Sequence, residues 1–256
     1  MSEEKKKRIN PLYRPVKWLV KLLSPRYTCV GTENLPDEAF VAVGNHAQMY
    51  GPLACEFYMP FPRRTWCAGE MMRWREVPDY AFHDFWPHKP KRVQWFYRLL
   101  SYLITPLSVL IFNNAETIPV FHDARVITTF RQSLKSLDEG VSCVIFPEHE
   151  EGGNGLVWDF QDKFIDLARM YYRRSGKALC FVPMYIAPRL NRVVFGPPVR
   201  YDPAGGADQE RARIKAALTE EITAMCLAQP RHTVIPYPNI PKSDYPENVL
   251  KEHDHA

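Results

Sequence analysis

The chain lacks the cysteine pairs that are typical of metal-binding or redox-active proteins, and its N-terminus does not resemble a secretory leader. Its six cysteines are scattered, and no two of them form a Cys-x-x-Cys pair. We therefore expect neither a zinc site nor a redox dithiol, but buried thiols in a reducing compartment. The N-terminus is charged and contains no uninterrupted apolar run, so we expect no secretory signal.

Two further absences narrow the function. No Gly-x-Ser-x-Gly motif is present, which argues against a Ser-His-Asp hydrolase. The net charge of +4 is concentrated in residues 1–26, which hold eight Lys or Arg and two Glu, so the remainder carries −2. Without a basic stripe on the rest of the chain, we expect no nucleic-acid partner.

With 256 residues of which 46% are apolar, the chain can form one domain with a sizeable core.

The first 26 residues predict a basic amphipathic arm. A run of cations at positions 5–8 precedes a helical pattern over residues 11–24. Arg14, Lys17 and Lys21 share one face of that helix. The opposite face is apolar and holds Leu12, Val16, Leu19, Val20 and Leu23. Such a helix suits an anionic membrane surface, although an ordinary surface helix packed on the domain would show the same pattern.

Two stretches in the middle of the chain lack a clear period. Residues 61–92 are rich in proline, aromatics and histidine, which predicts a long ordered loop or lid with a possible strand at 65–68. Residues 95–112 form the most apolar run, interrupted by Arg98, Pro106 and several hydroxyl side chains. We interpret this run as buried helices, with an interfacial or a membrane-spanning segment as alternatives.

The rest of the chain alternates strands and helices. Apolar runs at 118–121, 142–146, 179–186 and 192–196 predict strands, and helical stripes cover 123–140, 162–175 and 208–229. This alternation predicts an α/β fold, with a mixed, mostly parallel sheet covered by helices. We therefore expect three parts: the arm at 1–26, an α/β domain at 27–232 with 61–92 as an insertion, and an extended, proline-rich tail at 233–256.

One short stretch has the features of a reactive site. Val41 to Val43 predict a strand, Gly44 ends it, and Pro52 suits the start of a helix. Asn45 and His46 then lie at the carboxyl edge of a strand, where open α/β sheets bind ligands. Histidine is the side chain best suited to accept a proton near neutral pH, although His46 could equally cap the turn.

A second strand end is strongly polar. The strand at 143–146 runs into a turn that contains Glu148, His149, Glu150 and Glu151. Because both strand ends should meet at one sheet edge, Glu148 and Glu150 are expected near His46. A solvated acidic turn is the alternative. These side chains could also supply metal ligands, but none has a diagnostic spacing, and we predict no metal.

The two stretches together resemble the glycerolipid acyltransferase family, which transfers acyl chains onto lysophosphatidate or glycerol phosphate. The resemblance lies in the Gly-Thr-Glu-Asn-Leu-Pro segment at 31–36, in Asn45-His46 and in Phe146-Pro147-Glu148. The segments Ile118-Pro119-Val120 and Val182-Pro183 resemble two further blocks of that family. The similarity extends from Gly31 to Val199 and implies an acyltransferase-like scaffold.

The resemblance implies a function as well as a fold. It implies acyl transfer from an acyl thioester to a glycerolipid-type acceptor in phospholipid biosynthesis, with His46 as general base. The donor would be acyl-CoA or an acyl carrier protein, used as a substrate, and no cofactor is implied. The protein would be cytoplasmic and peripheral on the inner face of the cell membrane. A catalytically impaired lipid- or acyl-binding protein on the same scaffold is the alternative.

The chain departs from the family pattern where the chemistry is expected. The family's Asp, which orients the His as the third member of a triad does, is Gly51 here. Glu148, Glu150 and Glu56 are the carboxylates that could replace it, and we take Glu148 as the catalytic candidate. The family's Gly-Thr-Arg is His149-Glu150-Glu151, and its Asp-Arg is Phe121-His122.

The substrate-binding residues are predicted around the same turns. They are Asn45, His122, Arg125, His149, Glu150, Glu151 and Lys163. Two glutamates where the family holds a phosphate would repel a phosphomonoester, so we expect an acceptor with an amine or an uncharged hydroxyl. Arg125, Lys163 and Arg189 are the cations that could still attract a phosphate.

Overall fold

The computed structural model describes residues 9–86, 89–121, 123–149 and 152–249. It divides into two compact units, which we describe separately. Unit 1 comprises Met1–Pro25 and Cys67–Val126, and unit 2 comprises Arg26–Trp66 and Ile127–Ala256. The basic arm therefore groups with residues of the middle of the chain, and the C-terminal tail groups with the sheet.

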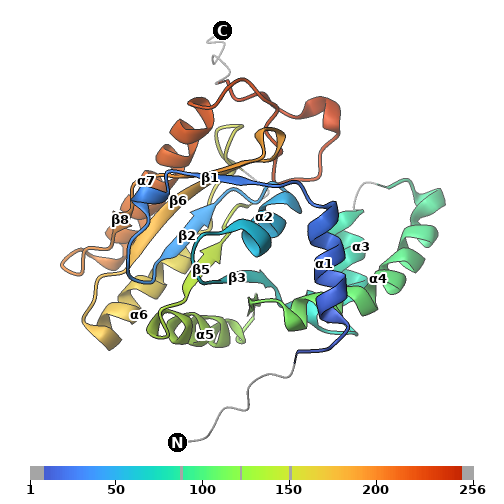
Figure 1. Ribbon diagram of the computed structural model, residues 1–256, viewed down its shortest axis with the longest axis horizontal. Coiled ribbons are helices and arrows are strands. Elements are labelled where there is room, and N and C mark those ends of the chain that lie inside the picture. Colours follow the sequence, from blue (N-terminus) through green and yellow to red (C-terminus); the bar gives the residue numbers. More distant parts are fainter. Residues whose placement is uncertain (1–8, 87–88, 122, 150–151, 250–256) are drawn as a thin grey trace, which may run out of the picture. The chain divides into compact units, whose positions relative to one another are not determined.

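Unit 2 is built on a mixed, mostly parallel sheet, as the sequence predicts (Figure 1). The strand order is β1-β7-β6-β2-β5-β3, and β8 also pairs with β6. All pairs are parallel except those that join β6 to β7 and to β8. The strands are β1 (Thr28–Val30), β2 (Val41–Gly44), β3 (Arg63–Ala68), β5 (Ser142–Ile145), β6 (Cys180–Ala187), β7 (Arg192–Phe195) and β8 (Val199–Arg200).

The central strands are apolar on both faces because both faces are covered. Every residue of β2, β5 and β6 is buried, which is typical of parallel strands with helices on either side. On one face, Ala42, Val144 and Val182 belong to a core that includes Ala54 and Cys55 of α2 (Tyr50–Tyr58). The other face is covered by η4 (Lys163–Ile165) and by α7 (Ala207–Leu227), which packs on β6. Helices α5 (Val126–Asp138) and α6 (Asp166–Ser175) complete the α/β alternation.

Unit 1 is mostly helical. It contains α1 (Tyr13–Leu23), η2 (Gly69–Met72), α3 (Val77–Phe85), η3 (Lys91–Val93), α4 (Gln94–Asn114) and β4 (Thr117–Val120). Its small core consists of Met71, Val77 and Ala81, with Ile104 and Phe112 of α4 packed against them. Helix α1 contacts α4, and the backbone N–H of Asn10 donates to the Asn114 side chain at 2.8 Å.

The predicted loop at 61–92 is instead largely regular structure. It contains β3, η2 and α3, which leave few residues between them. Pro78 lies in the first turn of α3, where its missing N–H has no helical partner, so it does not break the helix. The apolar positions of α3 that face the core span only nine residues, too few to show a period among the surrounding aromatics.

The expectation that the run at 95–112 is buried is wrong. The run is a single helix, α4, that continues through Pro106. Its buried residues are Ser101, Thr105 and Ser108, whereas none of its large apolar side chains is buried: six are exposed and the others are half-buried. By length and composition, Lys91–Asn114 is the one helix of the described residues that could cross a membrane, and only 17% of its apolar window is buried.

The C-terminal tail contains one short 3-10 helix, η6 (Lys242–Asp244), and it is packed onto unit 2 as far as the structure describes it. Val234 and Ile235 are buried, and Ile235 belongs to the core beside β2. Asn248 fastens the tail: its side chain accepts from the backbone N–H of His232 at 2.8 Å and donates to the carbonyls of Cys226 and Gln229 at 3.0 Å each. The tail is therefore part of the folded unit.

We predict that Asn248→Ala destabilises unit 2. Asn248 is 4% exposed, and its loss leaves the N–H of His232 and two carbonyl groups without this partner. A buried group left unsatisfied typically costs about 1–3 kcal/mol. Denaturant unfolding should show this loss, whereas Ser243→Ala, at an exposed position of the same tail, should leave stability unchanged. Equal stability of both variants would contradict a packed tail.

Candidate functional site

The strand register places the two predicted turns together. In the parallel pair of β2 and β5, Val43 lies opposite Ile145, so Asn45-His46 and Phe146-Pro147-Glu148 leave the sheet at the same carboxyl edge. The backbone N–H of His46 donates to Oε2 of Glu148 at 2.6 Å. The expectation that the two strand ends meet is therefore confirmed.

Asn45 links β2 to β6. Its Nδ2 donates to the carbonyl of Ile186 at 3.0 Å, and its Oδ1 accepts from the N–H of Ile186 at 2.7 Å. The side chain is 2% exposed and imitates one further residue pair of the β2–β6 ladder. This pairing gives Asn45 a structural role, and a contact with substrate stays a prediction.

The turn after His46 has an unusual backbone. Ala47 and Gln48 have φ values of 46° and 54°, a left-handed backbone conformation that residues other than glycine rarely adopt. Each such residue costs on the order of 1–3 kcal/mol and persists only where its surroundings enforce it. Here Ala47 is fully buried, and Nε2 of Gln48 donates to the Tyr245 hydroxyl at 2.9 Å. The tail therefore helps to hold the turn that carries His46.

The same turn requires glycine at position 51. The N–H of Gly51 donates to the carbonyl oxygen of His46 at 3.2 Å. A Cβ atom on Gly51 would lie 2.3 Å from that oxygen and 3.2 Å from the Phe146 ring. Position 51 therefore has no room for a carboxylate while the turn keeps this shape. The backbone conformation of the turn thus accounts for glycine, and not Asp, at this position.

The imidazole of His46 lies between two aromatic rings. Its centroid is 5.1 Å from that of Phe146 and 5.6 Å from that of Tyr237, both in edge-on geometry. Nδ1 is buried, and no side chain of the described residues forms a hydrogen bond with it. The residue keeps some solvent exposure, but burial lowers the pKa of His46 to about 4. The ring is therefore neutral at pH 7: it can accept a proton, but only as a weak base.

Glu148 contacts the backbone of His46, not its ring. Oε2 accepts from the N–H of His46, and Oε1 accepts from the N–H of Trp158 at 3.1 Å. Glu148 is 4% exposed, and burial raises its pKa to about 7, although both N–H donors act in the opposite direction. Its visible role is to join two loops, and a catalytic role stays a prediction. The other candidate within the described residues, Glu56, pairs with Arg63 at 3.1 Å.

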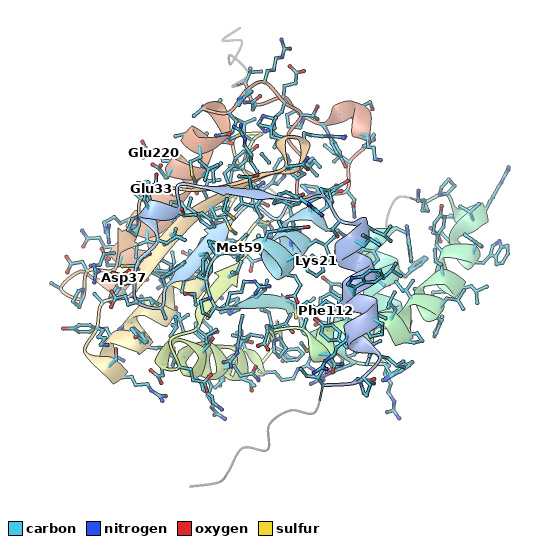
Figure 2. The ribbon with its side chains drawn as sticks, viewed as in Figure 1. Lys21, Glu33, Asp37, Met59, Phe112 and Glu220 are labelled. Atoms are coloured by element: carbon cyan, nitrogen blue, oxygen red, sulfur yellow. The ribbon has the colours of Figure 1, made fainter. Side chains whose placement is uncertain are left out.

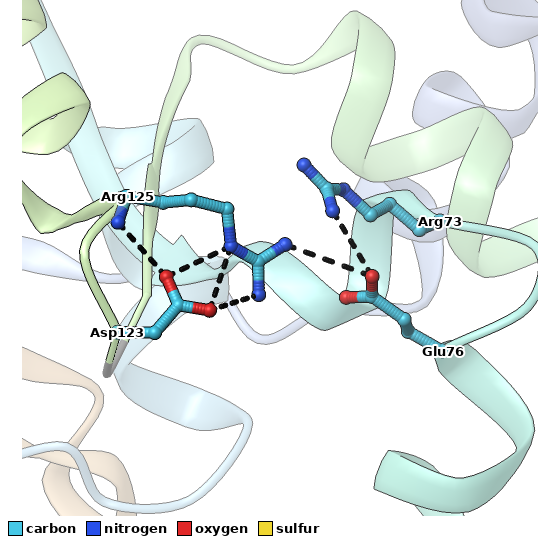
Figure 3. Close-up of polar contacts among 4 residues, drawn as sticks. All are labelled: Arg73, Glu76, Asp123 and Arg125. Carbon is cyan, nitrogen blue, oxygen red and sulfur yellow. Dashed lines mark hydrogen bonds and ion pairs between the residues drawn. The ribbon is translucent and has the colours of Figure 1, made fainter.

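The remaining predicted residues are dispersed. His149 and Lys163 are exposed in unit 2. Arg125 belongs to unit 1, where it pairs with Asp123 at 2.7 Å and with Glu76 at 3.6 Å (Figure 3). Its guanidinium also lies 4.0 Å from the centroid of the Phe121 ring. Arg125 is thus already engaged with two carboxylates. His122, Glu150 and Glu151 lie outside the described residues.

The site contains residues that sequence reasoning missed. Tyr237 and Tyr245 come from the tail, about 190 residues after His46, and Trp158 follows a turn whose length gives no hint of its contact with Glu148. No local pattern predicts such contacts. Within the described part of the chain, no three His, Cys, Asp or Glu side chains gather in a way that could hold a metal ion.

No protein-family model and no curated protein matches the chain. Among solved structures, it is similar to the crystal structure of the 1-acyl-sn-glycerophosphate (LPA) acyltransferase PlsC from Thermotoga maritima. The TM-score is 0.45 and the sequence identity is 16%, over 86% of this chain and 84% of that chain. At these values the likeness assigns no activity to the chain.

We predict that Gly51→Ala destabilises the protein, contrary to the usual effect of this change inside a helix. Alanine ordinarily stabilises a helix interior by about 1 kcal/mol relative to glycine. Here the new methyl group would overlap the His46 carbonyl, and such overpacking typically costs about 1–3 kcal/mol. Gly206→Ala is the control, because a Cβ there meets nothing nearer than 3.9 Å. A raised thermal midpoint for Gly51→Ala would refute the coupling between the turn and Gly51.

We predict that Glu148→Gln lowers stability in a pH-dependent way. Glutamine offers one acceptor oxygen for two N–H donors, which typically costs about 1–3 kcal/mol when a donor stays buried. Because the folded-state pKa of Glu148 is raised from 4.5 to about 7, the wild-type protein loses stability as pH rises through this window.

The variant lacks that titration, so its deficit relative to wild type should be largest near pH 5 and should shrink by pH 8. Denaturant unfolding at both pH values checks this. A deficit that is equal at pH 5 and pH 8 would show that Glu148 has no raised pKa.

Proposed function

We propose that the chain catalyses acyl transfer from an acyl thioester to a lipid acceptor, with His46 as the general base. The observation that supports this most is the junction of the two motif-bearing strand ends, where the Glu148 carboxylate fixes the backbone of His46. A strained, enforced turn presents the imidazole at the edge of the sheet where α/β folds bind ligands.

The reaction requires one proton transfer and one exchange of bonds. His46 would take the proton from the acceptor's hydroxyl or amine as that atom attacks the thioester carbonyl. The carbon–sulfur bond then breaks, and the thiolate leaves with the proton that the imidazole carries. The neutral state of His46 suits the first step, because only a neutral imidazole can accept a proton.

The weakness of this base suggests the class of acceptor. Loss of an orienting carboxylate costs about ten-thousand-fold in rate in one well-studied triad. An amine needs less help from a base than an alcohol, because its free form is already nucleophilic. Glu150 and Glu151 stand in the sequence where the resembled family has Thr and Arg, and their charge favours an amine or an uncharged hydroxyl over a phosphomonoester.

A non-catalytic lipid- or acyl-binding protein is the second candidate. Two observations favour it: no described carboxylate contacts the imidazole of His46, and position 51 has no room for one. Under either candidate, we place the protein at the cytoplasmic face of the cell membrane, with the basic arm in contact with anionic lipid.

The prediction that separates the two candidates concerns turnover. The purified full chain should release thiol from acyl-CoA or an acylated carrier protein when offered lysophosphatidate or amine- and hydroxyl-bearing lipids. His46→Ala should lower kcat/KM by about 10²–10⁴-fold, the usual contribution of a general base, in a variant that still folds. His83→Ala, an exposed histidine of α3, is the matched control.

Two results would contradict catalysis by His46. One is unchanged turnover in a stably folded His46→Ala variant. The other is saturable binding of the acyl thioester with no turnover towards any acceptor, which would establish the binding protein instead.

A further inference from the structure

Helix α4 presents its apolar side to solvent and its polar side to the protein. The exposed residues recur at one face of the helix, and their exposed fractions run from 47% to 69%. They are Trp95, Phe96, Leu99, Tyr102, Leu103 and Leu107, and we call them the apolar face of α4. In a helix that packs on a core in water, such residues would point inward.

The opposite side of α4 is held by small polar residues. Ser101, Thr105 and Ser108 are at most 7% exposed. The Ser108 hydroxyl donates to the carbonyl of Met71 at 2.9 Å, and Asn113 donates to that of Met72 at 2.8 Å. Small hydroxyl residues at helix contacts, with large apolar residues outside, are typical of helices that face lipid.

A second helix of unit 1 has the same feature. Leu12, the N-cap residue of α1, shares one stripe with Leu19 and Leu23 of that helix, and the three are 65%, 49% and 77% exposed. Its cations, among them the exposed Lys21 labelled in Figure 2, lie away from that stripe. Since α1 contacts α4, both apolar surfaces belong to one small body.

The charge of that body indicates what covers it. Unit 1 holds 14 Lys or Arg and 8 Asp or Glu, a net of +6, whereas unit 2 holds 19 and 21, a net of −2. Exposed Lys89, Lys91 and Arg92 directly precede α4. Anionic lipid headgroups attract such a cluster, whereas a second copy of the same positive unit would be repelled.

We propose that unit 1 docks on an anionic lipid bilayer by inserting the apolar face of α4 into the outer part of the acyl region. The helix lies in the interface and does not span, because its other side carries Arg98, paired with Asp79 of α3 at 2.5 Å, and the hydroxyl contacts to η2. Trp95 and Tyr102 suit the boundary between headgroups and acyl chains. This docking does not depend on the acyl-transfer activity.

The test uses vesicle flotation of the full chain. Vesicles of phosphatidylcholine with 30% phosphatidylglycerol should carry the wild-type protein, and vesicles of phosphatidylcholine alone should carry less. The double variant Leu99→Glu/Leu103→Glu should bind the anionic vesicles at least about tenfold more weakly, because each carboxylate would have to enter the apolar layer. Both positions are exposed, so the fold should keep its thermal midpoint and near-UV spectrum.

Ile127→Glu is the matched control. Ile127 is 64% exposed and Leu103 is 66% exposed, but Ile127 lies on α5 in unit 2, and its change should leave vesicle binding intact. Unchanged binding of the double variant would overturn the proposal. So would a wild-type protein that ignores both kinds of vesicle, sediments as a dimer and becomes monomeric in the double variant, since the face would then join two copies.

Discussion

The candidate site depends on one buried carboxylate. Glu148 receives the backbone N–H of His46 on one oxygen and that of Trp158 on the other, and it does so almost completely shielded from water. Leaving either donor unpaired would typically cost about 1–3 kcal/mol, so the contact fixes the turn after β2 against the loop after β5. The His46 ring, Phe146 beside it and the left-handed residues 47 and 48 all lie next to this junction.

The turn after β2 also determines which residue position 51 can hold. With Ala47 and Gln48 left-handed, the helix after the turn begins so close to the His46 carbonyl that position 51 accepts only glycine. A carboxylate at position 51 is thereby excluded, and the His46 ring packs between Phe146 and Tyr237. Desolvation without a compensating charge keeps His46 neutral. The neutral imidazole can accept a proton, but its low pKa gives little driving force for that transfer.

Much of the sheet could be predicted from the sequence because its strands are continuous apolar runs between recognisable helices. The meeting of Asn45-His46 with Glu148 could be predicted for the same reason, since parallel strands end at a common edge. The turn conformation could not, because no glycine marks Ala47 or Gln48 as left-handed. The contacts of Tyr237 and Tyr245 depend on a proline-rich tail without periodicity. The exposure of α4 could not be predicted, because its apolar run does not reveal that Ser101, Thr105 and Ser108 make its buried contacts.

The central claim, that burial leaves His46 neutral and without a charged partner, is tested most directly by titrating its imidazole. NMR spectra of protein labelled at the histidine ring, with the His46 signals assigned by their absence in His46→Gln, give the pKa of this ring alone. The account predicts that His46 stays neutral from pH 8 down to pH 5 and has a pKa of about 4. A pKa at or above 6.5, the ordinary value for histidine, would contradict it, because only a solvated ring or a ring beside a carboxylate would give that result.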